Sequence, residues 1–322
     1  MEKIFWVNLF KSAKLIVTNM FNPISLAVPV YAYNRTRVFS KIYDREFGDI
    51  EFDNPSIVSF QSNPKARVVS YCTPVSETYR FFYGKDDNRI RRDMLVISFL
   101  SAFYDSIFDE DYNPASIEFV GKAFKGERVS PQTDLENLIV LALGKLEASI
   151  VRDRKGLYGC LNRIQELQIE GLDQRRERYC NLPDSSREEY LRHITFAKGA
   201  CTFLTYSFVS NPDLSDENLV RDIERIGTYL QVFDDMLDLY KDVQEGNVTL
   251  ITEWFIGEKE IWKRFREAFD LLDKRFLPSL TKPIVLQALK IMHREGLRKV
   301  KRFRKRLPEA TAKLHKMALL FR

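Results

Sequence analysis

The feature that most constrains the fold is a continuous stretch of about thirty helix-forming residues, 215–246. Its apolar residues recur three and four positions apart, which is the period of an α-helix. Ser215 is the expected N-cap of this helix, and Gly246 marks its expected end. A helix of this length needs other long helices to cover it, so the stretch predicts a bundle with a deep interior.

Other parts of the chain repeat this helical pattern. We expect helices over residues 88–111, 130–153 and 155–179, and another that begins with a capping box formed by Ser186 and Glu189. Two or three basic helices follow toward the C-terminus. The sequence therefore predicts an all-α protein of roughly ten helices.

No linker and no repeat of fixed period divides the chain, so we expect a single domain over residues 1–322. Residues 1–60 are predicted to form an irregular N-terminal segment, residues 88–255 the core helices with the candidate site, and residues 258–322 basic C-terminal helices. The run ARVVSYC is the nearest approach to strand alternation in the chain.

Composition limits the partners and the metal chemistry. Apolar residues make up 45% of the chain, enough for a core, and a surplus of five positive charges is too small to indicate nucleic-acid binding by itself. The four cysteines show no CxxC spacing and the three histidines lie far apart, so a metal ion would need oxygen ligands, which favours Mg²⁺. The most apolar N-terminal run is interrupted by Asn and Pro and is too short to span a membrane. We therefore expect a cytoplasmic protein that binds no nucleic acid.

An acidic stripe follows one face of the long helix 215–246. Its members, at helical spacing, are Gln231, Asp234, Asp238 and Asp242, with Asp235 and Lys241 beside them. Apolar residues flank this stripe on both sides, unlike the lysines and glutamates that border an ordinary solvated face. Carboxylates four positions apart repel one another, and Mg²⁺ would remove that penalty. The alternative is an exposed acidic stripe on a surface helix.

A second acidic pair lies in the expected helix 88–111. Asp105 and Asp109 are four positions apart, so they share a face and can hold one metal ion between them. Small residues precede them on that face and leave room between helices. If the two acidic helices face each other across a bundle, they would hold a cluster of Mg²⁺ ions, whose natural ligand is a diphosphate.

A diphosphate also requires positive charge, and Lys198 is the candidate. It precedes Gly199 in the middle of an otherwise apolar helix, where a lysine needs an anionic partner. The alternative is a lysine that lays its stem along the bundle and carries its charge to water at the rim.

These residues resemble motifs of the isoprenoid synthase fold. The segment GTYLQVFDDMLDLYKDVQEG resembles its second aspartate-rich helix, which has a Q-x-x-D-D-x-x-D pattern. Asp234, Asp238 and Asp242 also match the metal spacing of class I terpene cyclases. The order of the Lys198-Gly199 pair and this segment resembles that in bacterial large-terpene synthases, the class IB group related to tetraprenyl-β-curcumene synthase.

The first acidic pair fits the same resemblance more loosely. The segment DSIFDE looks like the first DxxxD-type motif of the class IB group. The resemblance covers about residues 90–255 and leaves the N-terminal 60 residues unassigned. It implies a single-domain helical bundle of the isoprenoid synthase type, with a deep central cavity.

The resemblance also implies a chemistry, in which a linear prenyl diphosphate is ionised, diphosphate is released, and the carbocation is cyclised or deprotonated to a terpene hydrocarbon. Three Mg²⁺ ions would be held by Asp105, Asp109, Asp234, Asp238 and Asp242, with Asp235 supporting the second motif. The residues expected to bind the diphosphate are Lys198, Gln231 and Lys241. The candidates for the aromatic wall of the substrate pocket are Phe99, Phe103, Tyr104, Phe203, Tyr206, Tyr229 and Phe233.

Two related enzyme classes stay open. Trans-prenyl diphosphate synthases usually carry a DDxxD motif followed by two arginines, whereas Asp105 is followed by Ser106 and no Arg-Arg pair comes after it. Head-to-head prenyltransferases use two DxxxD-like motifs, but their other signatures are not visible in this chain. Substrate length and product skeleton are not encoded in these motifs, and a homodimer stays open because this fold often forms dimers.

A basic run, RKVKRFRKR, occupies residues 298–306. It reads as a solvated face, or as a surface that touches a membrane in which a greasy prenyl substrate is dissolved. A non-enzymatic alternative is a basic helical scaffold that binds a membrane or nucleic acid. Such a scaffold gives no reason for acidic stripes that point inward.

Overall fold

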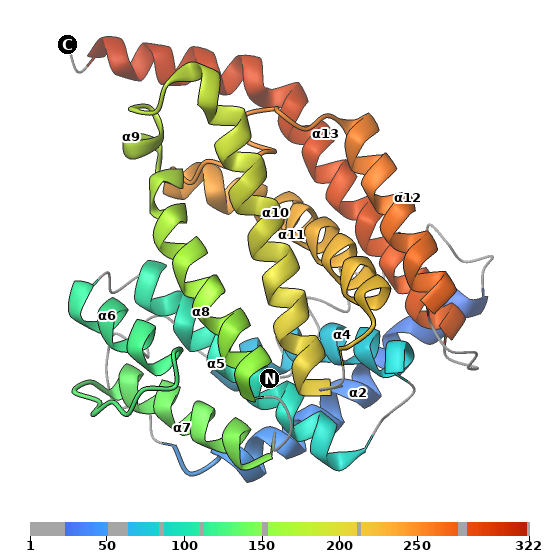
Figure 1. Cartoon of the computed structure of the whole chain (residues 1–322). Helices are drawn as coiled ribbons and strands as arrows, with labels where there is room; N and C mark the ends of the chain where they lie inside the picture. Colours follow the sequence, from blue (N-terminus) through green and yellow to red (C-terminus); the bar gives the residue numbers. More distant parts are fainter. Residues whose placement is uncertain are drawn as a thin grey trace.

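The computed structural model describes residues 23–50, 64–83, 87–109, 113–149, 154–210, 214–275 and 282–320, and beyond residue 305 it describes the backbone alone. Every regular element in these ranges is a helix, which confirms the all-α class (Figure 1). The elements are α2 (Pro23–Phe47), α4 (Pro64–Tyr83), α5 (Asn88–Asp109), α6 (Pro114–Ala123), α7 (Asp134–Ser149), α8 (Arg154–Glu170), the 3₁₀ turn η1 (Gly171–Gln174), α9 (Arg176–Tyr179), α10 (Asp184–Ser210), α11 (Glu217–Glu245), α12 (Glu258–Arg275) and α13 (Lys282–Leu320).

The helices α10 and α11 run side by side through the bundle and form its most extensive contact (Figure 1). On one side α8 and α5 pack on α10, and on the other side α12 and α13 pack on α11. The helices α2 and α4 pack on each other and on α5. Within the described ranges, no helix combines the length and the apolarity that a membrane crossing needs.

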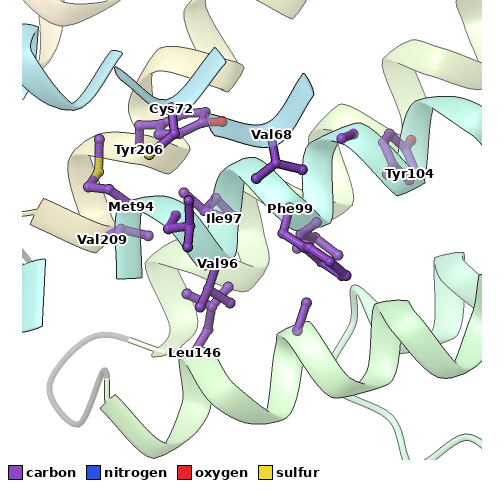
Figure 2. Close-up of a cluster of buried hydrophobic side chains, with 14 of the residues drawn as sticks. Val68, Cys72, Met94, Val96, Ile97, Phe99, Tyr104, Leu146, Tyr206 and Val209 are labelled. Atoms are coloured by element: carbon purple, nitrogen blue, oxygen red, sulfur yellow. The ribbon is translucent and has the colours of Figure 1, made fainter. Parts of the chain in front are cut away.

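A buried hydrophobic cluster fixes α5 in the bundle. Figure 2 shows side chains of four helices that meet there, and those labelled are Val68, Cys72, Met94, Val96, Ile97, Phe99, Tyr104, Leu146, Tyr206 and Val209. Full burial of a large apolar side chain contributes about 1.5–3 kcal/mol. The cluster therefore holds α5 firmly against α4, α7 and α10.

The N-terminal part contains a helix that the sequence did not indicate. The prediction that residues 1–60 are irregular is wrong for Pro23–Phe47, which form α2 although Pro29 lies inside it. The buried ring of Phe47 stacks on Phe99 of α5 with 3.9 Å between the ring centroids. Tertiary packing of this kind outweighs the weak helix propensity of the segment.

The remaining predictions for the N-terminal part concern the irregular segment and the run ARVVSYC. Residues 1–22 and 51–60 lie outside the described ranges. The run ARVVSYC lies inside α4, so the hint of strand alternation there was misleading. Its residues Val68, Val69 and Cys72 are buried at helical spacing, which explains the helix.

Two helix starts differ from those expected. The helix α10 begins at Asp184, so Ser186 is inside its first turn and donates its hydroxyl to the Pro183 carbonyl instead of forming the expected capping box. The helix α11 is capped by Asp216, whose carboxylate accepts from the backbone N–H of Asn218 at 2.9 Å. Ser215 therefore lies just outside the helix.

A third start is displaced by several residues. The helix expected from residue 130 begins at Asp134 and ends at Ser149. The Thr133 hydroxyl accepts from the Glu136 N–H at 3.2 Å, and Glu136 in turn accepts from the Gln132 N–H at 2.7 Å. This reciprocal capping holds the segment before Asp134 out of the helix.

Candidate functional site

A cleft of about 210 Å³ opens between α10, α11 and the segments that follow α8 and α11. Its described lining is mostly polar and brings together residues far apart in the sequence. The lining residues are Phe108, Gln168, Gly171, Leu172, Gln174, Arg175, Thr195, Lys198, Gln231, Asp234, Asp235, Asp238, Asp242, Asn247, Val248 and Thr249. Six of the residues expected from the sequence are among them, namely Lys198, Gln231 and the four aspartates of α11.

Two glycines bring the lysine and the aspartates together. Gly199 of α10 and Gly227 of α11 meet where these helices cross, and a Cβ on either one would collide with the backbone carbonyl oxygen of the other. A Cβ on Gly199 would also lie 2.8 Å from the Gln231 Cβ. Because only glycine permits this approach, Lys198 faces the acidic stretch of α11 across a narrow gap.

The rim of the cleft is formed where the expected helix 155–179 is broken. The helix α8 ends at Glu170, and the 3₁₀ turn η1 follows it. Gly171 is the first residue of η1, and the Lys198 ammonium and the Gln174 side chain lie close to where its Cβ would be. The η1 turn lines the cleft with Gly171, Leu172 and Gln174.

A short antiparallel pairing closes this rim. Arg175 adopts an extended conformation and pairs with Asn247, directly after α11. The Arg176 N–H donates to the Gly246 carbonyl at 2.8 Å, and the Val248 N–H donates to the Gln174 carbonyl at 2.8 Å. The α11 helix ends at Gly246, whose φ of 74° is left-handed and suits glycine. Two turns from different helix ends are thus joined over the cleft.

Asp235 is the buried carboxylate of the cleft. Its Oδ1 accepts from the Gln231 side-chain amide at 3.4 Å, while its Oδ2 has no hydrogen-bond partner among the described residues. Burial raises the pKa of Asp235 well above its usual range, and the charges of Asp234 and Asp242 add to the effect. An unpaired buried acceptor of this kind is costly, so the site favours a bound cation or a proton.

The other carboxylates repel one another in the same way. Loss of hydration, and then the Asp238 charge, raises the pKa of Asp234 to about 6, although its side chain reaches the water of the cleft mouth. Loss of hydration and the charges of Asp238 and Asp234 raise the pKa of Asp242 to about 7. The protein alone does not neutralise the acidic stripe.

Two positive side chains share the described lining of the cleft with these acids. The Lys198 ammonium donates to the Gln174 amide oxygen at 3.2 Å, and its charge lowers the pKa of Asp235. The Arg175 guanidinium is exposed and donates to the Phe108 carbonyl at 3.0 Å. Lys241 lies outside the described lining and is exposed, with its ammonium 3.8 Å from Glu245. Its expected contact with a diphosphate stays a prediction.

Of the first acidic pair, Asp105 contacts a residue of the cleft lining. Asp105 is not among the described lining residues, but its Oδ1 accepts from the side-chain amide of Gln168, which does line the cleft, at 3.4 Å. Asp109 is the last residue of α5, and its side chain lies outside what the structure describes. Their role in metal binding stays a prediction.

The aromatic residues expected to form a substrate pocket lie elsewhere in the described structure. Six of them are buried in the hydrophobic core, Phe233 packs against that core, and none of the seven lines the cleft; the six are Phe99, Phe103, Tyr104, Phe203, Tyr206 and Tyr229. The aromatic residue in the described lining of the cleft is Phe108, whose ring centroid lies 5.2 Å from that of Tyr104. A deep cavity among these rings therefore stays a prediction.

The donor chemistry suits Mg²⁺, although no ready-made cage is present. All candidate ligands are carboxylate oxygens, which Mg²⁺ prefers. Within the described ranges, no three His, Cys, Asp or Glu side chains are grouped closely enough to hold an ion. Mg²⁺ usually takes one or two carboxylates and completes its shell with water and phosphate oxygens. The spaced carboxylates and the unpaired Asp235 oxygen fit that mode of binding.

Several lining residues were not predicted from the sequence. Gln168, Gln174, Arg175, Asn247 and Thr249 come from a helix end and from two turns, where polar residues carry little signal of their own. Gly171 was the available clue, since a glycine inside a helical pattern lowers the expectation of continuous helix.

No protein-family model matches the chain. A search of curated proteins finds no significant match either. The function therefore has to be argued from the residues of the cleft.

Proposed function

We propose that the chain is a Mg²⁺-dependent class I terpene synthase of the class IB type. It would ionise a linear prenyl diphosphate, release diphosphate, and cyclise or deprotonate the carbocation to a terpene hydrocarbon. The observation that carries the proposal is that Lys198 meets Asp234, Asp235 and Asp238 in one cleft. A surface helix with a solvated acidic face would have no reason to bury Asp235 beside a lysine.

The charge balance of the cleft explains why a metal would be required. Four aspartates and two cationic side chains are among its described lining residues. A diphosphate would add further negative charge to a site whose carboxylates already repel one another. Bound Mg²⁺ would supply the missing positive charge and polarise the diphosphate oxygens. Asp234, Asp238 and Asp242 are the residues that would hold it, with Asp235 beside them.

The protein's own donors would stabilise the leaving group. The Lys198 ammonium is placed by Gln174, and the Arg175 guanidinium is placed by the Phe108 carbonyl. Both point positive charge into the cleft where negative charge develops as the allylic C–O bond breaks. Charge-assisted donors held in this way stabilise the developing diphosphate without further rearrangement.

The cleft also offers an apolar wall for the reacting carbon atoms. Phe108, Leu172 and Val248 lie among the polar residues of the lining. An aromatic ring face such as that of Phe108 stabilises a nearby carbocation. The rest of the prenyl chain would extend past Phe108 toward Tyr104, whose ring centroid lies 5.2 Å from that of Phe108, and the buried rings there would have to separate to admit it.

The test is a product assay with a series of prenyl diphosphates. Purified protein is incubated with farnesyl, geranylgeranyl and geranylfarnesyl diphosphates, with Mg²⁺ or with a chelator, and the organic extract is analysed by gas chromatography–mass spectrometry. We expect a hydrocarbon from one substrate only when Mg²⁺ is present. Hydrocarbon formation that persists with the chelator, or its absence with every substrate, would oppose the proposal.

A matched pair of variants ties the product to the cleft. Asp238→Asn removes an exposed carboxylate of the cleft, and Asp270→Asn removes an exposed carboxylate of α12. We expect Asp238→Asn to lower the rate about 100-fold and Asp270→Asn to leave it unchanged. If instead a longer diphosphate forms once isopentenyl diphosphate is added, the protein is a trans-prenyl diphosphate synthase.

A further inference from the structure

The positive charge of the chain is concentrated on one short segment of α13. Residues 290–305 contain eight Lys and Arg residues and one Glu, a surplus of seven positive charges. The whole chain has a surplus of five, so the remainder carries two more negative than positive charges. A modest net charge therefore hides a strongly basic segment.

The exposed Lys and Arg residues between positions 298 and 305 form a basic stripe, which we define as Arg298, Lys301, Arg302, Arg304 and Lys305. The side chains of Arg298 and Lys301 are 48% and 54% exposed, and each also contacts one glutamate, Glu295 and Glu258. Between them the helix buries Val300 and Phe303 against the bundle. The charged side chains thus face outward while the apolar ones anchor the helix.

An apolar patch lies beside the basic stripe, and we define it as Tyr240, Val243 and Trp254. Tyr240 and Val243 are 38% and 42% exposed. Both Tyr240 and Trp254 pack on Phe303, with ring centroids 5.7 Å and 6.0 Å away. The Arg304 guanidinium lies 5.7 Å from the centroid of the Trp254 ring. Aromatic, aliphatic and basic groups therefore share one surface.

We propose that the basic stripe and the apolar patch together bind an anionic lipid surface. Clustered Lys and Arg on an amphipathic helix attract acidic headgroups, and adjacent aromatic and aliphatic side chains enter the headgroup boundary. The exposed valine and tyrosine favour lipid over nucleic acid, whose phosphate backbone offers nothing to an aliphatic side chain. The lipid surface is thus the partner whose chemistry matches both halves of the site.

The position of the stripe connects it with the cleft. The Lys299 ammonium donates to the Leu237 carbonyl at 2.6 Å, and Leu237 directly precedes Asp238 of the cleft. Docking through this surface would hold the cleft close to the lipid, where a prenyl diphosphate is dissolved if the proposed function is right. Lipid binding itself requires no such substrate, so the two proposals fail or stand separately.

The test is co-sedimentation of the full chain with vesicles. Vesicles of phosphatidylcholine alone are compared with vesicles that also contain phosphatidylserine, at low and high salt. We expect the protein to sediment only with the phosphatidylserine vesicles and to be released by salt, because screening weakens the headgroup attraction. Equal sedimentation with both kinds of vesicle, or with neither, overturns the proposal. Binding to a duplex RNA without binding to the phosphatidylserine vesicles overturns it as well.

Two charge-reversal variants locate the surface. Arg302→Glu with Lys305→Glu changes the basic stripe, and Arg221→Glu with Arg225→Glu makes the same charge change on exposed residues of α11. The control residues Arg221 and Arg225 lie about 28 Å and about 22 Å from Tyr240 along the helix axis, at about 1.5 Å per residue. We expect the stripe variant to lower the partition coefficient at least about tenfold and the control to retain it. Equal binding by the two variants overturns the assignment of the surface.

A neutral variant guards against misfolding. Circular dichroism compares the helix content of each variant with that of the unchanged protein. If Arg302→Glu with Lys305→Glu loses helix, Arg302→Gln with Lys305→Gln takes its place, and a loss of vesicle binding is again expected. Binding equal to that of the unchanged protein in this folded variant contradicts the proposal.

Discussion

Gly199 of α10 and Gly227 of α11 pack against each other, and a Cβ on either residue would collide with the carbonyl oxygen of the other. This contact sets the distance between the two central helices. It also places Lys198 opposite Gln231 and Asp235, so the packing of the bundle and the geometry of the cleft depend on the same two residues.

Gly199→Ala should therefore destabilise the protein. The added methyl group would force α10 and α11 apart, and overpacking of this kind costs about 1–3 kcal/mol, more than the better helix propensity of alanine restores. We expect a net loss of about 1–2 kcal/mol in the free energy of unfolding, measured by urea denaturation. Gly159→Ala in α8 is the control, because nothing lies within 4 Å of its missing Cβ, and it should stabilise. Equal effects of the two substitutions would show that the close contact is absent.

The acidic stripe should leave a mark on the pH dependence of stability. Asp242 has a pKa raised from 3.8 to about 7, so the folded protein binds more protons than the unfolded chain between these values. Its contribution to the free energy of unfolding must then fall as pH rises through this window. In the presence of a chelator, Asp242→Asn should become more stable than the unchanged protein by about 1 kcal/mol near neutral pH, since partial exposure screens the repulsion.

Thermal denaturation over a series of pH values measures this difference. The gap between Asp242→Asn and the unchanged protein should be small near pH 4 and should widen toward pH 7, as the pKa values of Asp242 in the two states require. Added Mg²⁺ should close it by stabilising the unchanged protein alone. A gap that is constant over this range would mean that Asp242 is not held in a repulsive cluster.

His293 should affect the pH dependence of stability in the opposite direction, so that stability is lost as pH falls. It is fully buried, and its Nδ1 forms a hydrogen bond with the Tyr229 hydroxyl at 2.9 Å. Burial lowers the pKa of His293 from 6.5 to about 4. The unfolded chain binds the proton first, so the stability that neutral His293 supports is lost as pH falls from 6.5 to about 4. His293→Leu should lower stability at neutral pH but flatten the loss in this acid range, whereas His193→Leu, at an exposed position, should keep the acid loss. An unchanged acid slope in His293→Leu would contradict this assignment.

Lys198 should matter for turnover more than for stability. Lys198→Gln removes the cation that faces the diphosphate site while keeping a side chain of similar length and polarity. We expect diphosphate release from the active prenyl substrate to slow about 100-fold, because one donor to a developing anion typically contributes this much. Lys155→Gln on the exposed face of α8 is the matched control and should react at the normal rate. Equal rates for the two variants would remove Lys198 from the proposed chemistry.

The rim of the cleft depends on the left-handed conformation of Gly246. Alanine at this position meets a φ of 74°, which costs a non-glycine residue about 1–2 kcal/mol. Gly246→Ala should lower the free energy of unfolding by that amount, whereas Gly144→Ala inside α7, with nothing within 4 Å of its missing Cβ, should not lower it. Chemical denaturation of the two variants measures the difference. A neutral Gly246→Ala would show that α11 ends without this conformation.

The sequence predicted the helices better than it predicted the turns between them. The helix that ends at Gly246 was foreseen, because helical periodicity and a terminal glycine are local signals. The break after Glu170 was not, because the turn that follows it is held by pairing with the distant segment at Asn247 and Val248. The helix at Pro23–Phe47 was missed for a similar reason, since packing of Phe47 on Phe99 supports it.

The same distinction holds for the cleft. Helical spacing was enough to place Asp234, Asp238 and Asp242 on one face, and a lysine in an apolar helix was enough to mark Lys198. Spacing did not reveal Arg175, whose position follows from its pairing with Asn247. Nor does it reveal a cavity, which depends on how side chains of several helices pack together.

Binding of diphosphate together with Mg²⁺ in the cleft can be measured by calorimetric titration. Inorganic diphosphate is titrated into the full chain with and without Mg²⁺, and into the Asp238→Asn and Asp270→Asn variants. We expect saturable binding in Mg²⁺ that is lost with a chelator, weakened at least about tenfold by Asp238→Asn, and unchanged by Asp270→Asn. Diphosphate binding that is as tight without Mg²⁺, or as tight in Asp238→Asn, would show that the cleft is not a Mg²⁺–diphosphate site.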